Sequence, residues 1–383
     1  MNEILARGRP DVLFAYLGDV MASSRALRQL RALSEAGFLV EAISLVSGTA
    51  HQVPDEPFPV RYVRMKAGRG PVFYLRAHRA LSRAVSGRKA SVFLASDLYC
   101  LPAMSVAATR SQAALVFDSR EMYAHLDSTA QKPFARSIWR AIERWYIGQA
   151  DRVLTVNDAI ADRLASMYNI ERPLVSPNVA AKSMQPTGAL RQELGLEETV
   201  PIVLYQGLFR KGRGLETLVR ATAAVDGAHL VLIGEGVLGP RLTALGASLL
   251  GERFHQIPFT NPDKLATLTA DADVGALLIE PLTESLRLSL PNKLFEYAAA
   301  GLPTLAGPGL EAVDQVLSQY QAGLIATDLS DKAVSQSLRQ LLFDPHIRES
   351  CIREAARLTD EYNWDRYQKA LIDEIRALRD QLH

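Results

Sequence analysis

The segment PIVLYQGLFRKGRGLETLVRATAAVDGAHLVLIGEG, residues 201–236, carries the pattern that decides the fold class. It begins with a short apolar run that predicts a buried strand and continues with helical spacing over 213–224. It ends with a second apolar run that stops at glycines. A strand, a helix and a second strand in this order form a β-α-β unit, in which the two strands lie parallel and the helix covers one face of the sheet.

The same alternation recurs on both sides of this segment. Apolar runs that predict further strands lie at 11–17, 38–46, 91–96, 113–119, 152–156, 253–259, 273–281 and 303–307. Helical patterns lie at 22–37, 71–86, 98–109, 133–149, 238–250 and 261–270. A chain of 383 residues is too long for one ordinary core. We therefore predict an α/β protein with two doubly wound, Rossmann-like domains, whose ligands bind beyond the carboxyl ends of the strands and in the cleft between the domains.

A proline-containing stretch without a clear period, from Pro173 to about Val200, predicts the linker between the domains. We place the first domain at residues 1–180 and the second at 195–360. The C-terminal helix, about 361–383, is expected to pack back on the first domain.

Composition excludes several classes of protein. The chain is 48% hydrophobic and 22% charged, as in soluble globular proteins, and its formal net charge of +1 argues against nucleic-acid binding. Cys100 and Cys351 are far apart, which suggests neither a disulfide framework nor a zinc site. No apolar run approaches the ~18 residues of a membrane span, and MNEILARGRP at 1–10 lacks a signal-peptide core. We expect a cytoplasmic protein.

One tract departs from the near-neutral balance of the chain. Residues 57–96 contain no Asp or Glu but nine basic residues: Arg61, Arg64, Lys66, Arg69, Arg76, Arg79, Arg83, Arg88 and Lys89. The part from Val72 to Val85 has helical spacing with apolar residues among its arginines. This basic tract, 61–89, is either the solvated face of a packing helix or a surface for anionic lipid or a phosphate-bearing acceptor, which would place the protein peripherally at the inner face of a membrane. The sequence leaves both interpretations open.

Two other segments predict an anion site. After the strand that ends at Gly207, a loop carries Arg210, Lys211 and Arg213, and a helix follows. In SLPNKLFEYAAAGLP, residues 289–303, a helix is expected to open after Pro291 with Ser289 or Asn292 as its cap. Free helix N–H groups beside cations bind phosphate, and a carboxylate one turn in, Glu296, can accept two hydroxyl hydrogen bonds from a ribose. Together these features fit a nucleoside diphosphate.

The stretch GEGVLG, 234–239, formally matches the dinucleotide-binding pattern G-x-G-x-x-G. It follows the second strand of its domain, however, and the next strand ends in Pro258-Phe259 without an acid for a ribose. We interpret it as a tight strand-to-helix turn, and a dehydrogenase is the function that we expect least.

The chain resembles the family 4 glycosyltransferases of the GT-B fold from about Ser91 to Gly307. In the C-terminal half the resemblance lies in YQG (205–207), RGLE (213–216), LIGEG (232–236), ADVGALLIEP (272–281) and PNKLFEYAAAGLP (291–303). In the N-terminal half it lies in ASDLYCLP (95–102), VFDSREMY (116–123), ADRVLTVN (150–157) and PNV (177–179). It implies a GT-B architecture, in which an N-terminal domain on the acceptor side and a C-terminal nucleotide-sugar-binding domain face a cleft.

The resemblance implies a retaining, metal-independent transfer of a sugar, without a cofactor, from a UDP- or GDP-linked donor to a sugar, glycan or lipid-linked acceptor. It assigns the leaving diphosphate to Arg213, with Lys211 beside it, and the ribose to Glu296. The further residues expected at the donor are Gly207, Arg210, Gly234, Ser289, Asn292, Lys293 and Leu294. On the acceptor side we expect Gly18, Asp19, Arg120 and Glu121.

The chain departs from the family's pattern at two positions. The first glutamate of the E-x7-E pair falls at Leu288, and the histidine of a D-x-H-E segment falls at Arg120. Glu280 and Glu284 lie near Leu288 but lack the spacing. Two other functions stay open: a nucleotide-sugar epimerase or hydrolase, for which Glu121 with His125 is the candidate acid-base pair, and a non-catalytic nucleotide-sugar binding partner.

Overall fold

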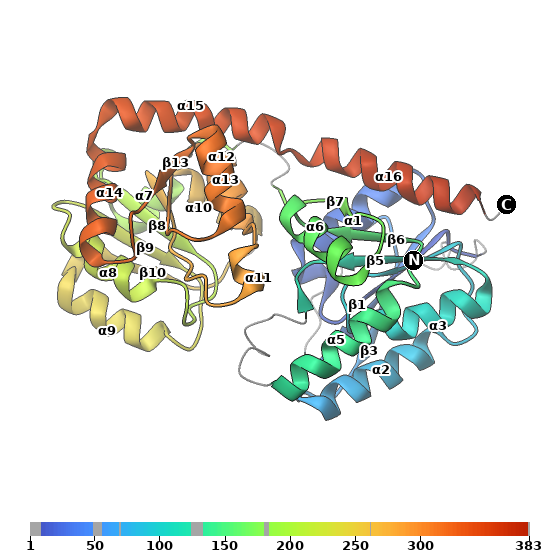
Figure 1. The fold of residues 1–383 in the computed structure, drawn as a ribbon. Helices are drawn as coiled ribbons and strands as arrows, with labels where there is room; N and C mark the ends of the chain where they lie inside the picture. Colours follow the sequence, from blue (N-terminus) through green and yellow to red (C-terminus); the bar gives the residue numbers. More distant parts are fainter. Residues whose placement is uncertain are drawn as a thin grey trace. The chain divides into compact units, whose positions relative to one another are not determined.

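The computed structural model describes residues 9–48, 56–68, 70–123, 133–179, 184–260 and 262–381. Contacts divide the chain into two compact units, which we call unit 1 (1–178 with 365–383) and unit 2 (179–364). Each unit contains one sheet of parallel strands with helices on its faces (Figure 1). The predicted α/β fold class is therefore confirmed.

Unit 1 contains a seven-stranded sheet of order β3-β2-β1-β4-β5-β6-β7. Its strands are β1 (Val12–Tyr16), β2 (Val40–Val46), β3 (Val60–Arg64), β4 (Val92–Ala95), β5 (Ala114–Ser119), β6 (Arg152–Thr155) and β7 (Leu174–Val175). Its helices are η1 (Val20–Ala22), α1 (Ser24–Glu35), α2 (Pro71–Val85), α3 (Leu101–Ser111), α5 (Pro133–Ile147), α6 (Asp158–Tyr168) and the C-terminal α16 (Trp364–Asp380), which joins this unit from Asp365 onward. Strands β2, β4 and β5 are buried along their whole length, as expected for a sheet with helices on both faces.

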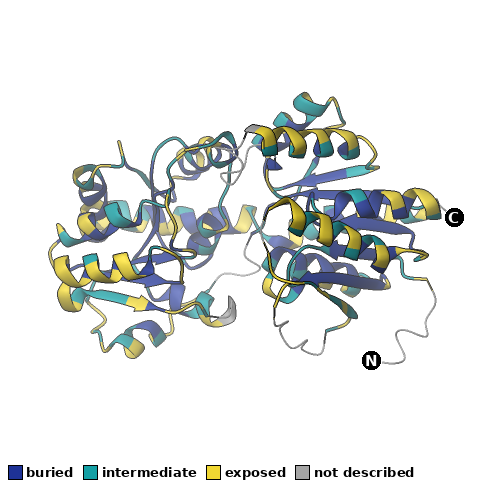
Figure 2. Ribbon diagram, turned by 90° about the horizontal axis from the view of Figure 1, so that it is seen from below, coloured by how far each residue is buried: buried dark blue, intermediate teal, exposed yellow. Residues whose placement is uncertain are grey.

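Unit 2 contains a six-stranded parallel sheet of order β10-β9-β8-β11-β12-β13. Its strands are β8 (Ile202–Gln206), β9 (His229–Ile233), β10 (Phe254–Ile257), β11 (Val274–Leu277), β12 (Thr304–Ala306) and β13 (Gly323–Ile325). Its helices are α7 (Ala189–Leu194), α8 (Leu215–Ala223), α9 (Gly239–Leu249), η3 (Gly251–Arg253), α10 (Pro262–Ala270), α11 (Glu284–Arg287), α12 (Asn292–Ala299), α13 (Glu311–Tyr320), α14 (Asp331–Phe343) and α15 (Pro345–Glu361). Figure 2 shows the buried strands inside each unit and the exposed outer faces of the helices.

The core of unit 2 lies on both faces of its sheet. Val203 and Tyr205 of β8 belong to one buried apolar cluster, and Ile202 and Leu204 belong to another. Successive side chains of a strand point to opposite faces, so a strand buried on both sides reads as an uninterrupted apolar run. This is the run that predicted the strand from sequence.

The prediction of a linker from Pro173 to Val200 is wrong in part, because β7 and α7 both lie within it. Asp271 defines the start of α7: its carboxylate accepts hydrogen bonds from the backbone N–H groups of Thr187, Gly188 and Leu190 at 2.7–2.8 Å. The Leu190 side chain is fully buried. Hydrogen bonds to Asp271, which lies 81–84 positions later in the sequence, position this helix. The local sequence therefore shows no helical period that would predict it.

The loops that follow β8 and β9 approach each other at glycines. Gly234 has φ +142°, and a Cβ there would lie 2.1 Å from the Gly207 carbonyl oxygen. Gly236 has φ +154°, and a Cβ there would lie 2.4 Å from the Phe209 carbonyl oxygen. The close packing of two backbones accounts for both glycines, as expected for a tight strand-to-helix turn.

This approach can be tested with two glycine substitutions in unit 2. Gly227→Ala introduces a side chain at φ +72° with open space around it, so it should cost only the ~1–2 kcal/mol of left-handed strain. Gly234→Ala adds a backbone clash to that strain and should cost about 3–5 kcal/mol of the free energy of unfolding. Urea unfolding followed by circular dichroism measures both. Equal losses in the two variants would contradict the close approach.

Candidate functional site

The strand order of unit 2 changes direction between β8 and β11. The chain runs from β8 outward through β9 and β10, then returns to β11 on the other side of β8. The loops after β8 and β11 therefore lead away in opposite directions, and in doubly wound sheets ligands bind in the crevice that such a change of direction leaves at the carboxyl ends of the strands. The loop after β8 is fixed on both sides. The Phe209 N–H donates to the Glu235 carbonyl at 2.8 Å, and the Glu280 N–H donates to the Gly212 carbonyl at 3.0 Å.

The N-terminus of α12 lies at this crevice and has no side-chain cap. The residue at the cap position is Pro291, with φ −65° and ψ 139°. The prediction that Ser289 or Asn292 caps the helix is wrong. Ser289 donates its hydroxyl to the Leu286 carbonyl at 2.7 Å, and Asn292 is exposed as the first helical residue. Because proline has no side-chain acceptor, the first N–H groups of the helix are left without that partner.

Cations lie beside this helix end. The Lys293 Nζ is 5.2 Å from the centre of the Tyr205 ring, and a Cβ on Gly207 would lie 2.9 Å from it. Burial lowers the pKa of Lys293 to about 8, and the positive charges of Arg213 and Arg210 add to this effect while Glu296 opposes it. Arg213 and Arg210 also act on the buried Tyr205 hydroxyl, whose pKa burial raises to about 12. Arg210, Arg213 and Lys293, which we call the cation group, thus share one electrostatic environment. Lys211 is exposed in the same loop.

The Glu296 carboxylate is held in a fixed orientation. Gln206, at the end of β8, donates its side-chain N–H to the Glu296 Oε2 at 2.6 Å. The Thr269 hydroxyl lies 2.6 Å from the Gln206 Oε1, which fixes the amide in turn. Gln206 and Thr269 are both buried. A half-buried carboxylate supported in this way is preorganised to accept hydroxyl groups from a ligand.

Two leucines near the crevice belong to the core. Leu294 is fully buried, and its backbone N–H donates to the Pro291 carbonyl at 3.1 Å. Leu288 is 7% exposed and ends α11, so its side chain replaces a glutamate with a packing group. Gly207 and Gly234 lie against each other at the ends of β8 and β9, and their contact with a ligand remains a prediction.

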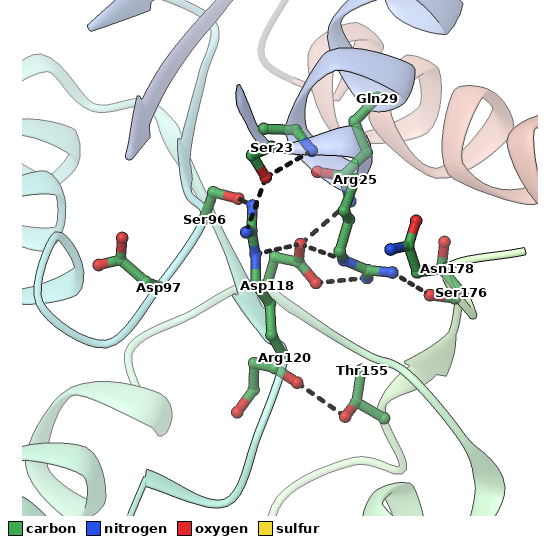
Figure 3. Close-up of polar contacts among 12 residues, drawn as sticks. Ser23, Arg25, Gln29, Ser96, Asp97, Asp118, Arg120, Thr155, Ser176 and Asn178 are labelled. Carbon is green, nitrogen blue, oxygen red and sulfur yellow. Dashed lines mark hydrogen bonds and ion pairs between the residues drawn. The ribbon is translucent and has the colours of Figure 1, made fainter. Parts of the chain in front are cut away.

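Unit 1 contains a buried ion pair at the corresponding end of its sheet (Figure 3). Arg25 of α1 donates from Nε and Nη2 to the two oxygens of Asp118 at 2.8 and 2.6 Å, and also donates to the Ser176 carbonyl. Gln29 donates to Asp118 at 3.1 Å. Burial alone would raise the pKa of Asp118, but the charge and hydrogen bonds of Arg25 outweigh it and lower the pKa. The pair connects α1, β5 and the segment after β7.

Arg120 lies next to this pair (Figure 3). Its guanidinium donates to the hydroxyls of Ser96 and Ser23, the latter at 3.2 Å, and lies 4.6 Å from the centre of the Tyr16 ring. Its Nε is 3.7 Å from the Asp118 carboxylate. Burial acts to lower its pKa, but the carboxylate of Asp118 raises it overall. Arg120 is therefore a charged group that ties together the ends of β1, β4 and β5, and Glu121 beside it is exposed.

Gly18 and Asp19 hold the loop after β1. The Asp19 carboxylate accepts from the Met21 N–H at 3.0 Å, which caps η1, and from the Tyr62 hydroxyl at 3.3 Å. Burial, followed by the charge of Asp19, raises the pKa of Tyr62 to about 12. The Gly18 carbonyl accepts from the Ser44 hydroxyl at 2.7 Å. These contacts give both residues a structural part, and their contact with an acceptor remains a prediction.

Sequence reasoning missed several residues of these two sites. Asp97 accepts from the Leu17 N–H at 2.7 Å and from the Cys100 N–H at 2.8 Å, and burial raises its pKa. Arg25 was missed because it lies in the first turn of α1, before the apolar residues that mark the helix. A buried acid such as Asp118 needs a positively charged partner, but the sequence does not show which residue provides it. Gln206 gave no signal beyond its place at a strand end. His125 and Arg69 lie outside the described residues.

In the ranges that the structure describes, no group of three or more His, Cys, Asp or Glu side chains is placed to hold a metal ion. Within the same ranges no helix is long and apolar enough to cross a membrane.

Two family models match the chain. Residues 22–178 match the Glycosyl transferase 4-like domain, and residues 187–358 match Glycosyl transferases group 1. The chain is 26% identical over 277 residues to a D-inositol 3-phosphate glycosyltransferase of Actinosynnema mirum, a match that covers 66% of this chain and 63% of that relative. The chain thus spans less than two thirds of the relative's length.

Solved structures share the fold over nearly the whole chain. A sucrose-phosphate synthase from Thermosynechococcus elongatus has a TM-score of 0.74 at 18% identity and covers 97% of this chain and 99% of its own. Anabaena HepE, solved in complex with UDP-glucose, has a TM-score of 0.73 at 14% identity, with 96% and 99% covered. A putative UDP-N-acetylglucosamine 2-epimerase from Listeria monocytogenes also matches, with a TM-score of 0.68 at 13% identity and 98% of each chain covered. At these identities the likeness shows the fold alone. The two family models and this shared architecture show that the chain belongs to the family 4 type of glycosyltransferases, with the GT-B fold.

Proposed function

We propose that the chain transfers a sugar from a nucleoside diphosphate sugar, UDP- or GDP-linked, to a hydroxyl group of a sugar, glycan or lipid-linked acceptor. The observation that carries this proposal is the cation group beside the N-terminus of α12, which has no side-chain cap. The lowered pKa of Lys293 means that its charged form is less stable in the free protein than that of a lysine in water, and Glu296 offsets only part of this. A diphosphate bound there would stabilise the charged form and accept hydrogen bonds from the helix N–H groups.

The remaining contacts fit the rest of a nucleotide. Glu296, held by Gln206, is placed to accept the two hydroxyls of a ribose. Gly207 and Gly234 offer close approach to the backbone beside the phosphates. UDP-glucose in the Anabaena protein of the same fold favours a uridine nucleotide among the candidates.

In the proposed reaction the bond between the sugar C1 and the β-phosphate oxygen breaks, and negative charge develops on that phosphate. Arg213 and Lys293, with Arg210 and Lys211 nearby in the loop, stabilise this charge. One such preorganised group contributes about 3–4 kcal/mol to lowering a barrier. The acceptor hydroxyl attacks from the face that the diphosphate leaves, and the departing phosphate takes its proton, so the anomeric configuration is retained. The cations serve the role that a metal ion has in other transferases.

Two other functions remain candidates for specific reasons. A putative epimerase from Listeria monocytogenes shares this fold, and Leu288 in place of a glutamate is compatible with a non-catalytic binding partner. Incubation with a panel of nucleotide sugars separates them. Free nucleotide without acceptor indicates hydrolysis, an altered sugar indicates epimerisation, and neither, with binding intact, indicates a binding module.

Substitutions at the two ends of the nucleotide should have different effects. Arg213→Met removes charge stabilisation and should lower kcat by about a hundredfold or more. Glu296→Gln weakens the hydrogen bonds to the ribose hydroxyls, so it should raise KM for the donor more than it lowers kcat. The measurement is steady-state transfer from the donor that gives the largest thermal stabilisation among UDP, GDP, ADP and dTDP sugars.

Matched controls come from the same unit. Arg220→Met on α8 breaks an exposed pair with Asp331 of α14, and Glu193→Gln breaks an exposed pair with Lys264. Both controls should transfer at nearly wild-type rates, since exposed pairs contribute little to stability. Near-normal turnover by folded Arg213→Met and Glu296→Gln would remove the core of the proposal.

The stereochemical outcome is a separate prediction. Proton NMR of the product formed from an α-linked donor should show the α anomer, because attack occurs on the face from which the diphosphate leaves. A β-linked product would exclude the retaining mechanism and would require a protein base, for which Glu121 is the exposed candidate on the acceptor side.

A further inference from the structure

Helices α2 and α5 of unit 1 expose large apolar side chains together with arginines. On α2, Val72 is 58% exposed and Leu75 is 49% exposed. On α5, Phe134 is 80% exposed, Trp145 is 71% exposed and Ile138 is 43% exposed. The six exposed arginines of the two helices are Arg76, Arg79 and Arg83 on α2 and Arg136, Arg140 and Arg144 on α5. We call these eleven side chains the α2–α5 surface.

The two helices lie side by side through a cluster of aromatic rings (Figure 1). Tyr74 of α2 stacks on Tyr99 at 4.7 Å and meets the Trp139 ring of α5 edge-on at 4.9 Å. Tyr99 also contacts Trp139, at 5.1 Å between ring centres. The rings fix the two helices to each other, so their exposed side chains belong to one rigid part of unit 1.

The exposed residues of α2 form one line along the helix. Its buried face is made by Ala77, Leu81, Ala84 and Val85, which are 1–7% exposed. Val72, Arg76, Arg79 and Arg83 recur at intervals of three and four residues, with Leu75 beside Arg76, which places all five on the opposite side. The part of the basic tract that had two interpretations is therefore a solvent-facing row of mixed apolar and cationic side chains.

Helix α5 presents the same two kinds of side chain. Phe134, Ile138 and Trp145 are separated by four and seven residues and so share one side of the helix. Arg136, Arg140 and Arg144 follow a second line at intervals of four. The only acid on the two helices is Glu143, which is 1% exposed and accepts a hydrogen bond from the Tyr168 hydroxyl at 2.7 Å. The α2–α5 surface thus has six exposed cations and no exposed acid on its own helices.

We propose that the α2–α5 surface docks unit 1 on a lipid bilayer that contains anionic headgroups. The arginines complement the headgroup charge, and the apolar side chains can enter the boundary between headgroups and acyl chains, where tryptophan and phenylalanine are favoured. A soluble polyanion would be bound by the cations alone and gives no reason for Phe134 and Trp145 to be exposed. The inference does not depend on the proposed transferase reaction, because membrane binding is measured directly.

Binding should be reversible and sensitive to salt. Each cation near an anionic membrane changes the partition coefficient by about fivefold, so three neutralised arginines should change it by about a hundredfold. Surface charge is screened within about 8–10 Å at physiological ionic strength, so binding should weaken steeply as salt rises.

The test is cosedimentation of the full chain with phosphatidylcholine vesicles that contain about a third phosphatidylglycerol, at low and high salt. Wild type should pellet at low salt and stay in the supernatant with pure phosphatidylcholine. The variant Arg76→Gln, Arg79→Gln, Arg83→Gln should lose about a hundredfold in partitioning. The matched control, Arg241→Gln, Arg339→Gln, Arg353→Gln, removes the same charge from exposed positions in unit 2 and should pellet like wild type.

Trp145 reports insertion separately from charge. In the variant Trp139→Phe, Trp364→Phe it is the sole tryptophan of the chain, and its emission should shift to shorter wavelength with anionic vesicles and be quenched by brominated lipid. The proposal is overturned if wild type does not pellet at low salt, if the α2 variant pellets as well as the control, or if Trp145 emission is unchanged in vesicle-bound protein. Binding of heparin with no binding of vesicles would also overturn it and would assign the surface to a soluble polyanion.

Discussion

The parallel pairing of β8 with both β9 and β11 is the constraint on which the site in unit 2 depends. It brings the carboxyl ends of three strands to one edge, and the change in chain direction between β8 and β11 keeps their loops apart. Gly207 and Gly234 then let the loops after β8 and β9 touch backbone to backbone. A side chain at Gly234 would clash with the Gly207 backbone and displace the loop that carries Arg210 and Arg213, and with it the cation group.

The charged clusters of the two units differ in how they are neutralised. In unit 1, Arg25 and Asp118 form a buried bidentate pair that satisfies both charges within the protein. In unit 2 burial and the positive charges of Arg213 and Arg210 lower the pKa of Lys293, and Glu296, which accepts a hydrogen bond from Gln206, opposes this effect. The neutralised pair of Arg25 and Asp118 holds elements of unit 1 in place. Cations that repel one another in a partly buried site, as in unit 2, favour the binding of an anion. This contrast is why we place the diphosphate in unit 2.

Much of the fold could be predicted because its strands and helices show a regular spacing of apolar residues in the local sequence. The apolar runs of β1, β8 and β9 and the helical spacing of α1, α8 and α9 agree with the structure to within a few residues. Helix α7 could not be predicted, since the Asp271 that orders its first turn lies about 80 positions away in sequence. Helix α12 opens after Pro291 as expected, but the proline itself occupies the cap position, so the predicted cap by Ser289 or Asn292 was wrong.

The site was predicted only as far as residue types reveal it. The loop cations and Glu296 could be identified because charges beside helix starts are uncommon within apolar stretches. Gln206 and Arg25 could not be, because their importance lies in partners 90 and 93 residues away. Sequence motifs predicted where the ligand site lies in unit 2. Only the tertiary structure shows which neighbouring residues orient the charged side chains of that site. The same holds for α5, whose exposed apolar side chains resemble core residues in the sequence alone.

The most direct test of the central claim is proton uptake when a nucleotide diphosphate binds. At about one pH unit above the lowered pKa of Lys293, which is about 8, its amine is mostly neutral in the free protein, and a bound diphosphate should raise that pKa and charge it. Calorimetry of UDP or GDP binding at this pH, in buffers of different ionisation enthalpy, should show uptake approaching one proton. At neutral pH, where the amine is already charged, Lys293 should contribute almost no uptake, and Lys293→Met should show none at either pH. Tight nucleotide binding without proton uptake in wild type, or with equal uptake in Lys293→Met, would contradict the assignment of the diphosphate to the cation group.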